Sequence, residues 1–103
     1  MTERYKKETL LFKAFADDNR LQIIELLVQG EYCACDLLEK LSVGQSTLSH
    51  HMKILTDCGV VSSRRSSKWT YYTLNDIGIQ NARNSLDRIL SKKGISQIQC
   101  DCD

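Results

Sequence analysis

The sequence has no proline, no internal repeat and no low-complexity linker, and its length of 103 residues predicts one domain. No apolar run is long enough to span a membrane, and residues 1–7 are not followed by the apolar core of a signal peptide. We therefore expect a cytoplasmic protein with no membrane partner. Neither a nucleophile–base–orienter set nor a phosphate-binding loop is present, so we expect no enzymatic activity.

The sequence also lacks a strong overall charge, because its net charge is only +1. The charges are nevertheless uneven along the chain. Residues 45–70 hold four basic side chains, Lys53, Arg64, Arg65 and Lys68, against the single acidic residue Asp57. This concentration of positive charge in one segment is typical of a surface that contacts DNA.

Cysteine, by contrast, is abundant, with five residues in this short chain. Two pairs are separated by one residue, Cys33 with Cys35 and Cys100 with Cys102. Thiols stay reduced in the cytoplasm, so ligand binding or reactivity is a better interpretation than structural disulfides.

The first half of the chain has the periodicity of four helices. We expect them over 9–16, from the possible caps at 17–19 to Gly30, from residue 33 or 34 to 41, and over 45–58 with an end at Gly59. A tight turn at Val43 and Gly44 separates the last two. A helix, a glycine-bearing turn and a second helix form the helix-turn-helix pattern.

The pattern then changes to β-branched and aromatic residues over 60–65 and 69–74, with the polar turn 66–68 between them. This segment predicts a β-hairpin, and a last helix follows the cap at Asn75 and Asp76 and ends near residues 92–94. The predicted fold is mostly α with a β-hairpin wing, an α+β winged helix-turn-helix in the order ααααββα. We assign residues 1–94 to this domain and 95–103 to a cysteine-bearing tail.

The helix at 45–58 has one apolar face and one polar face. With about 3.6 residues per turn, Leu48, Met52 and Leu55 face inward. Polar side chains suited to base edges and phosphates lie on the other face and its edges. The DNA-binding candidates are Gln45, Ser46, Thr47, Ser49, His50 and Lys53 in the helix, with Arg64, Arg65 and Lys68 on the hairpin. The alternative is a solvated amphipathic helix without DNA contact. We expect His51 in the core and Trp69 in hairpin packing.

Three motifs together resemble the ArsR/SmtB family of winged-helix repressors that respond to metals and metalloids. They are Phe15-Ala-Asp-Asp-Asn-Arg-Leu-Gln-Ile23, Cys33-Ala-Cys-Asp-Leu37 and Gln45-Ser-Thr-Leu-Ser-His-His-Met-Lys-Ile-Leu55. The resemblance implies a homodimer held by the first and last helices. It also implies binding to double-stranded operator DNA with inverted symmetry, and release when an inducer binds.

Cys33 and Cys35 are the first candidate ligands for that inducer. Thiolates prefer thiophilic partners, among which trivalent arsenic and antimony bond to two or three sulfurs. Residues two apart on an ideal helix point about 200° apart, so both sulfurs face one ion only if the helix start is extended or unwound. Closing them on one ion would then distort the helix that precedes the DNA-reading helix.

A third sulfur is missing from the pattern of the arsenic-responsive branch, because position 38 is Leu38. Cys100 and Cys102 are candidates from the tail of the same or the other subunit. Without a third sulfur, the site would suit a methylated trivalent arsenical. We interpret Cys58 as a packing residue. No histidine follows Asn75, so we expect no zinc site between the last helices and no cofactor needed for folding.

Two alternatives remain open from the sequence. A repressor of the same fold could instead sense thiol oxidation, persulfides or another soft metal, since paired cysteines also form reversible disulfides. A protein of a different class would be a binding module that sequesters thiophilic ions without a DNA function.

Overall fold

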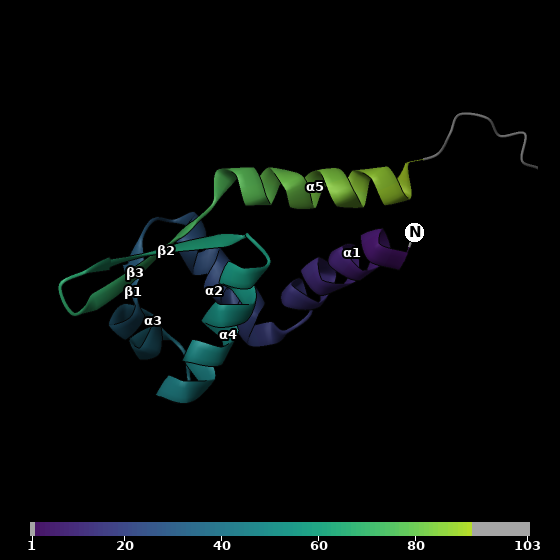
Figure 1. The fold of residues 1–103 in the computed structure, drawn as a ribbon. Helices are drawn as coiled ribbons and strands as arrows, with labels where there is room; N and C mark the ends of the chain where they lie inside the picture. The colour runs from purple at the N-terminus through teal and green to yellow at the C-terminus, as the bar shows by residue number, and fades with distance from the viewer. Residues whose placement is uncertain (1, 92–103) are drawn as a thin grey trace, which may run out of the picture.

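The computed structural model describes residues 2–91, and the predicted tail lies outside them. The described residues form five helices and a small sheet, and the hairpin projects from one end (Figure 1). In chain order the elements are α1 (Thr2–Phe15), α2 (Asp18–Val28), β1 (Tyr32–Cys33), α3 (Ala34–Lys40), α4 (Gln45–Asp57), β2 (Val61–Ser66), β3 (Trp69–Leu74) and α5 (Asp76–Leu90). This arrangement confirms the predicted winged helix-turn-helix class.

Two of the predicted helix caps are present in the structure. Asp17 precedes α2 in an extended conformation, and its side chain accepts hydrogen bonds from the backbone N–H groups of Asn19 and Arg20 at 2.9 and 3.1 Å. Asn75 caps α5 by accepting from the Gly78 N–H at 2.8 Å. Its amide also donates to the Ser62 hydroxyl at 2.8 Å, which ties the start of α5 to β2.

The sheet has three antiparallel strands in the order β1–β3–β2. The predicted hairpin is confirmed, and its turn places Ser67 at a φ of 60°. The predicted order did not include β1, in which Tyr32 pairs with Tyr72 and Cys33 with Tyr71. Two residues are too few to show the period of a strand, so β1 depends on its pairing with β3.

The apolar core lies where α2, α3 and α4 meet the sheet. Its fully buried side chains include Ile23, Leu37, Met52, Leu55 and Val60. The inward face predicted for α4 is confirmed, since Leu48, Met52 and Leu55 are all buried. Within residues 2–91, no helix combines the length and apolar character needed to cross a membrane.

Helices α1 and α5 extend side by side to the end of the molecule opposite the hairpin (Figure 1). An ion pair between Arg88 and Glu8 connects them. Several large apolar side chains on these two helices remain exposed in the single chain, namely Leu10, Ile77, Leu86, Ile89 and Leu90. The α1 helix also begins earlier than the 9–16 segment predicted from apolar spacing, because its first turns are polar.

The start of α5 packs tightly against the end of α4. A Cβ atom at Gly78 would lie well inside van der Waals contact of the Gly59 carbonyl oxygen. This obstacle is backbone, which cannot rotate away as the end of a long side chain can.

We predict that Gly78→Ala destabilises the protein. Alanine favours a helix over glycine by about 0.5–1 kcal/mol, but overpacking against backbone costs about 1–3 kcal/mol and should dominate. Urea unfolding followed by circular dichroism measures the difference. The matched control is Gly44→Ala, where a Cβ meets no atom within 4 Å and the change should stay below about 1 kcal/mol. Equal unfolding free energies for Gly78→Ala and the wild type would contradict this packing.

Candidate functional site

The predicted DNA-reading helix is α4, the second helix of the helix-turn-helix. Its six candidate side chains are all exposed: Gln45, Ser46, Thr47, Ser49, His50 and Lys53. Lys53 forms an ion pair with Asp57 one turn later, at 3.1 Å. Both side chains are largely exposed, and such a pair is worth little in water, so Lys53 can exchange Asp57 for a phosphate. The structure thus presents an exposed, polar helical face, and the major groove of B-DNA is wide enough to admit an α-helix.

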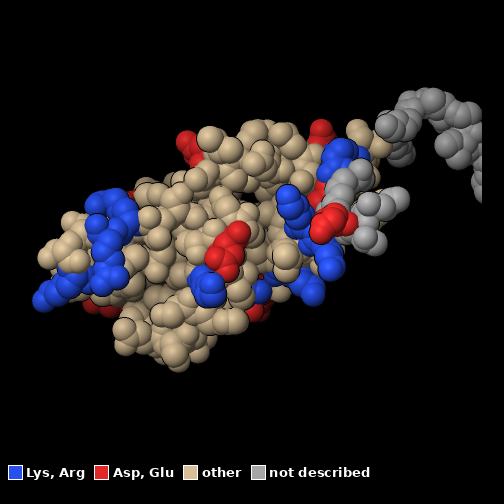
Figure 2. Space-filling model, in the orientation of Figure 1, with Lys and Arg blue, Asp and Glu red and all other residues tan. Residues whose placement is uncertain are grey.

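The hairpin adds basic side chains to this surface. Arg64, Arg65 and Lys68 are exposed, and Figure 2 shows the basic patch at the hairpin end of the molecule. Arg64 donates two hydrogen bonds to the carboxylate of Glu31, both at 2.9 Å, and lies 4.5 Å from the centre of the Tyr71 ring. Its guanidinium lowers the pKa of Glu31, and Glu31 raises the pKa of Arg64. Glu31 was missed by the sequence analysis because the two residues are far apart in the chain.

His51 lies on the inward side of α4, as predicted, and is only 6% exposed. Its Nδ1 atom lies 2.9 Å from an Nη atom of Arg20. Guanidinium groups only donate hydrogen bonds, so Nδ1 is the acceptor and Nε2 carries the proton of the neutral ring. Arg20 also donates to the carbonyls of Ala14 and Lys13, at 2.9 and 3.1 Å, where α1 ends. Arg20, which sequence reasoning overlooked, therefore connects α1 and α2 with the reading helix.

The ring of His51 is held neutral by these surroundings. Burial is the main reason that its pKa is lowered, and the positive charges of Arg20 and His50 act in the same direction. The carboxylate of Asp17 acts against them by favouring the protonated ring.

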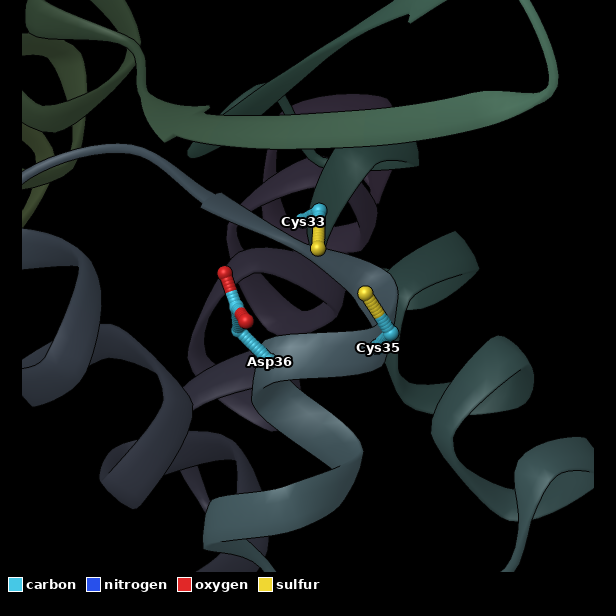
Figure 3. Close-up of side chains that lie close together, drawn as sticks. All are labelled: Cys33, Cys35 and Asp36. Carbon is cyan, nitrogen blue, oxygen red and sulfur yellow. The ribbon is translucent and has the colours of Figure 1, made fainter.

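Cys33 and Cys35 meet at the junction of β1 and α3. Cys33 is buried and precedes the first helical residue with extended dihedrals, φ −84° and ψ 162°, whereas Cys35 is exposed in the first turn. This extended start lets both sulfurs face one point, as Figure 3 shows. The two sulfurs and a carboxylate oxygen of Asp36 all lie within 4.8 Å of one another.

Asp36 was not among the predicted ligands, although it is adjacent to Cys35 in the chain. The cysteine spacing pointed to a third sulfur, whereas the described residues bring a carboxylate to the cysteine pair. Among residues 2–91, no other group of three such side chains is close enough to hold a metal ion. The remaining candidates, Cys100 and Cys102, lie outside the described residues.

The thiol of Cys35 has a raised pKa. The largest cause is its hydrogen bond with Cys33, followed by burial and by the negative charges of Cys33 and Asp36. Cys58 is half-buried, donates to the Leu55 carbonyl at 3.4 Å and packs against the core, as predicted.

Comparison with known proteins places these features in a wider group. Residues 17–63 match the family model for bacterial regulatory proteins of the arsR family. The chain is 41% identical over 95 residues to the arsenical resistance operon repressor of Bacillus subtilis, covering 90% of each protein. It is 39% identical over 71 residues to the cadmium resistance regulator CadC of Listeria innocua, covering 68% of this chain and 60% of that protein. The structure of HlyU from Vibrio cholerae superposes with a TM-score of 0.68 at 30% identity, over 89% of this chain and all of that one.

We predict that the burial of His51 makes the stability of the protein sensitive to acid. The folded-state pKa of His51 is lowered, so the unfolded chain takes up a proton first as the pH falls below about 6.5. The free energy of unfolding should then decrease between about pH 7.5 and about pH 5.5 in urea titrations. The variant His51→Asn, which keeps an acceptor for Arg20 but cannot titrate, should show a smaller decrease.

The control for this experiment is His50→Asn, because His50 is exposed on the same helix. It should retain most of the wild-type dependence on pH, because His50 is the smallest of the influences on the pKa of His51. An equal decrease in the wild type and in His51→Asn would rule out His51 as the responsible group.

Proposed function

This chain belongs to the ArsR family of bacterial transcriptional regulators, and we propose that trivalent arsenic or antimony, bound to Cys33 and Cys35, releases it from operator DNA. The observation that carries the proposal is the place of the two sulfurs. They meet at the start of α3, which leads through a short turn into the exposed helix α4. A ligand at the sulfurs is therefore within one helix of the DNA surface.

The DNA surface we propose consists of the polar face of α4 and the basic hairpin. Short polar side chains of α4 would contact base edges, while Arg64, Arg65 and Lys68 would contact the phosphate backbone or the minor groove. A homodimer would present two such surfaces to an operator with inverted symmetry. The exposed apolar side chains of α1 and α5 support dimerisation through these helices.

The sensing step rests on the preference of soft ions for thiolates. Each sulfur gives up its proton when it bonds to arsenic. Cys33 belongs to the strand that pairs with β3 of the hairpin, whereas Cys35 belongs to α3. Drawing the two sulfurs onto one atom would thus move the helix-turn-helix relative to the hairpin. An inducer acts only if it binds the DNA-free shape more tightly than the DNA-bound shape.

A soft divalent metal such as cadmium is a second candidate inducer. The carboxylate of Asp36 near both sulfurs favours it, because carboxylates bind divalent cations together with thiolates. The similarity to a cadmium resistance regulator points the same way. Asp36→Asn separates the candidates, since it should weaken the response to cadmium and leave the response to arsenite unchanged.

We predict that Cys33→Ser and Cys35→Ser bind operator DNA normally but resist release by arsenite. Each variant removes one of two sulfur bonds, so release should need at least about tenfold more arsenite. Fluorescence anisotropy of a labelled operator duplex, measured without oxygen, gives both affinities. Cys58→Ser is the control and should respond as the wild type does.

Full release of Cys35→Ser from DNA at the arsenite concentration that releases the wild type would show that Cys35 is not a ligand of the inducer. Release by peroxide, with none by arsenite, would favour the redox alternative instead.

We also predict that Lys53→Ala and Arg64→Ala weaken operator binding and make it less sensitive to salt. Each lost phosphate contact should reduce the slope of log affinity against log salt concentration by about one. The control is Arg83→Ala, on α5 and away from the proposed DNA surface. A binding module without a DNA function would show no salt-dependent operator affinity in any variant.

A further inference from the structure

A cavity of about 300 Å³ opens beside Cys35, between α3, the first half of α4 and the hairpin. Apolar and aromatic side chains form part of its lining, namely Leu38, Leu48, Met52, Trp69 and Tyr72. Polar side chains form much of the rest and include Gln45, Ser49 and Lys68. The cavity thus joins the thiol site to the proposed DNA surface, and neither of these sites explains the aromatic side chains in its lining.

The position of Cys35 in the cavity wall limits what the cavity can hold. Two thiolates satisfy two of the three valences of trivalent arsenic, and the third projects from the same atom. Among the described residues, no third sulfur lies close to the pair. A monosubstituted arsenical already holds carbon in its third valence and needs only these two sulfurs, and the cavity beside Cys35 offers apolar and aromatic side chains to that substituent. Cavities of about 150 Å³ with apolar walls take up benzene, so this cavity has room for a phenyl ring.

We propose that this cavity binds the aromatic substituent of a monosubstituted trivalent arsenical, an inference that rests on the sulfur site of the proposed function. The arsenic keeps its bond to carbon and exchanges two hydroxyl groups for the sulfurs of Cys33 and Cys35. Two As–O bonds and two S–H bonds break, two As–S bonds form and two water molecules leave. No electrons are transferred, so no oxidant or reductant is needed.

Occupation of the cavity also acts on DNA binding directly. Gln45 and Ser49 in the lining are candidate base contacts, and Lys68 is a candidate phosphate contact. A ring seated beside them would hold α4 and the hairpin in positions set by the ligand rather than by DNA. An arylarsenical should therefore release DNA at lower concentrations than arsenite does.

The test uses phenylarsine oxide, methylarsenite and arsenite as probes of the full-length protein. Trp69 is the only tryptophan of the chain and lines the cavity, so its fluorescence reports on occupation. All three probes should bind the thiols, but phenylarsine oxide should change Trp69 emission most. It should also bind at least about tenfold more tightly than methylarsenite, because burying a ring removes apolar surface from water.

A variant that fills the cavity provides the second test. Leu38→Phe should weaken the binding of phenylarsine oxide at least about tenfold, because the new ring occupies the same space. It should leave the binding of arsenite unchanged. The matched control is Leu26→Phe, at another half-buried leucine outside the cavity. It should affect neither probe. The wild-type fluorescence comparison decides the question if Leu38→Phe fails to fold.

The possible outcomes distinguish failure of the cavity proposal from failure of the proposed function. If arsenite binds and releases DNA but phenylarsine oxide binds no more tightly than methylarsenite and changes Trp69 emission equally, the cavity proposal is overturned and the proposed function stands. If Leu38→Phe loses the binding of both phenylarsine oxide and arsenite, the cavity proposal is also overturned. If the thiols bind the probes but DNA stays bound, the proposed function fails while cavity binding survives.

Discussion

The pairing of Tyr32 and Cys33 with β3 is the constraint on which the candidate site depends. Without it, the segment before α3 would be free to continue as helix, and the sulfurs of Cys33 and Cys35 would point apart. Pairing keeps Cys33 extended and buried while α3 starts one residue later. The same two residues attach the thiol site to the hairpin, so any movement of the sulfurs is shared with the wing.

A second connection links the end of α1 to α4. Arg20 uses its fixed donors on two carbonyls of α1 and on His51 of the reading helix. Carbonyls in the last turn of a helix lack the usual partner four residues later, and Arg20 supplies donors to two of them. Helix α1, which we propose to form part of the dimer, is in this way connected to the helix that we propose reads DNA.

The sequence predicted the long helices and the hairpin well because their signals are local. Caps at Asp17 and Asn75, apolar spacing in α4 and β-branched residues in the hairpin each determine structure over a few residues. The predictions missed what depends on distant partners. Strand β1, the ion pair of Arg64 with Glu31 and the Arg20–His51 contact each join residues more than 30 positions apart.

The sequence by itself was enough to identify the family motifs, the pair of thiols one residue apart and the positive charge over residues 45–70. Each of these features is a property of neighbouring residues. Only the tertiary structure decided that both sulfurs face one point, that Asp36 lies beside them and that a cavity opens next to Cys35. The physical reason is that strand pairing overrides the helical geometry that the local sequence would otherwise allow, and the direction of a side chain follows from its backbone.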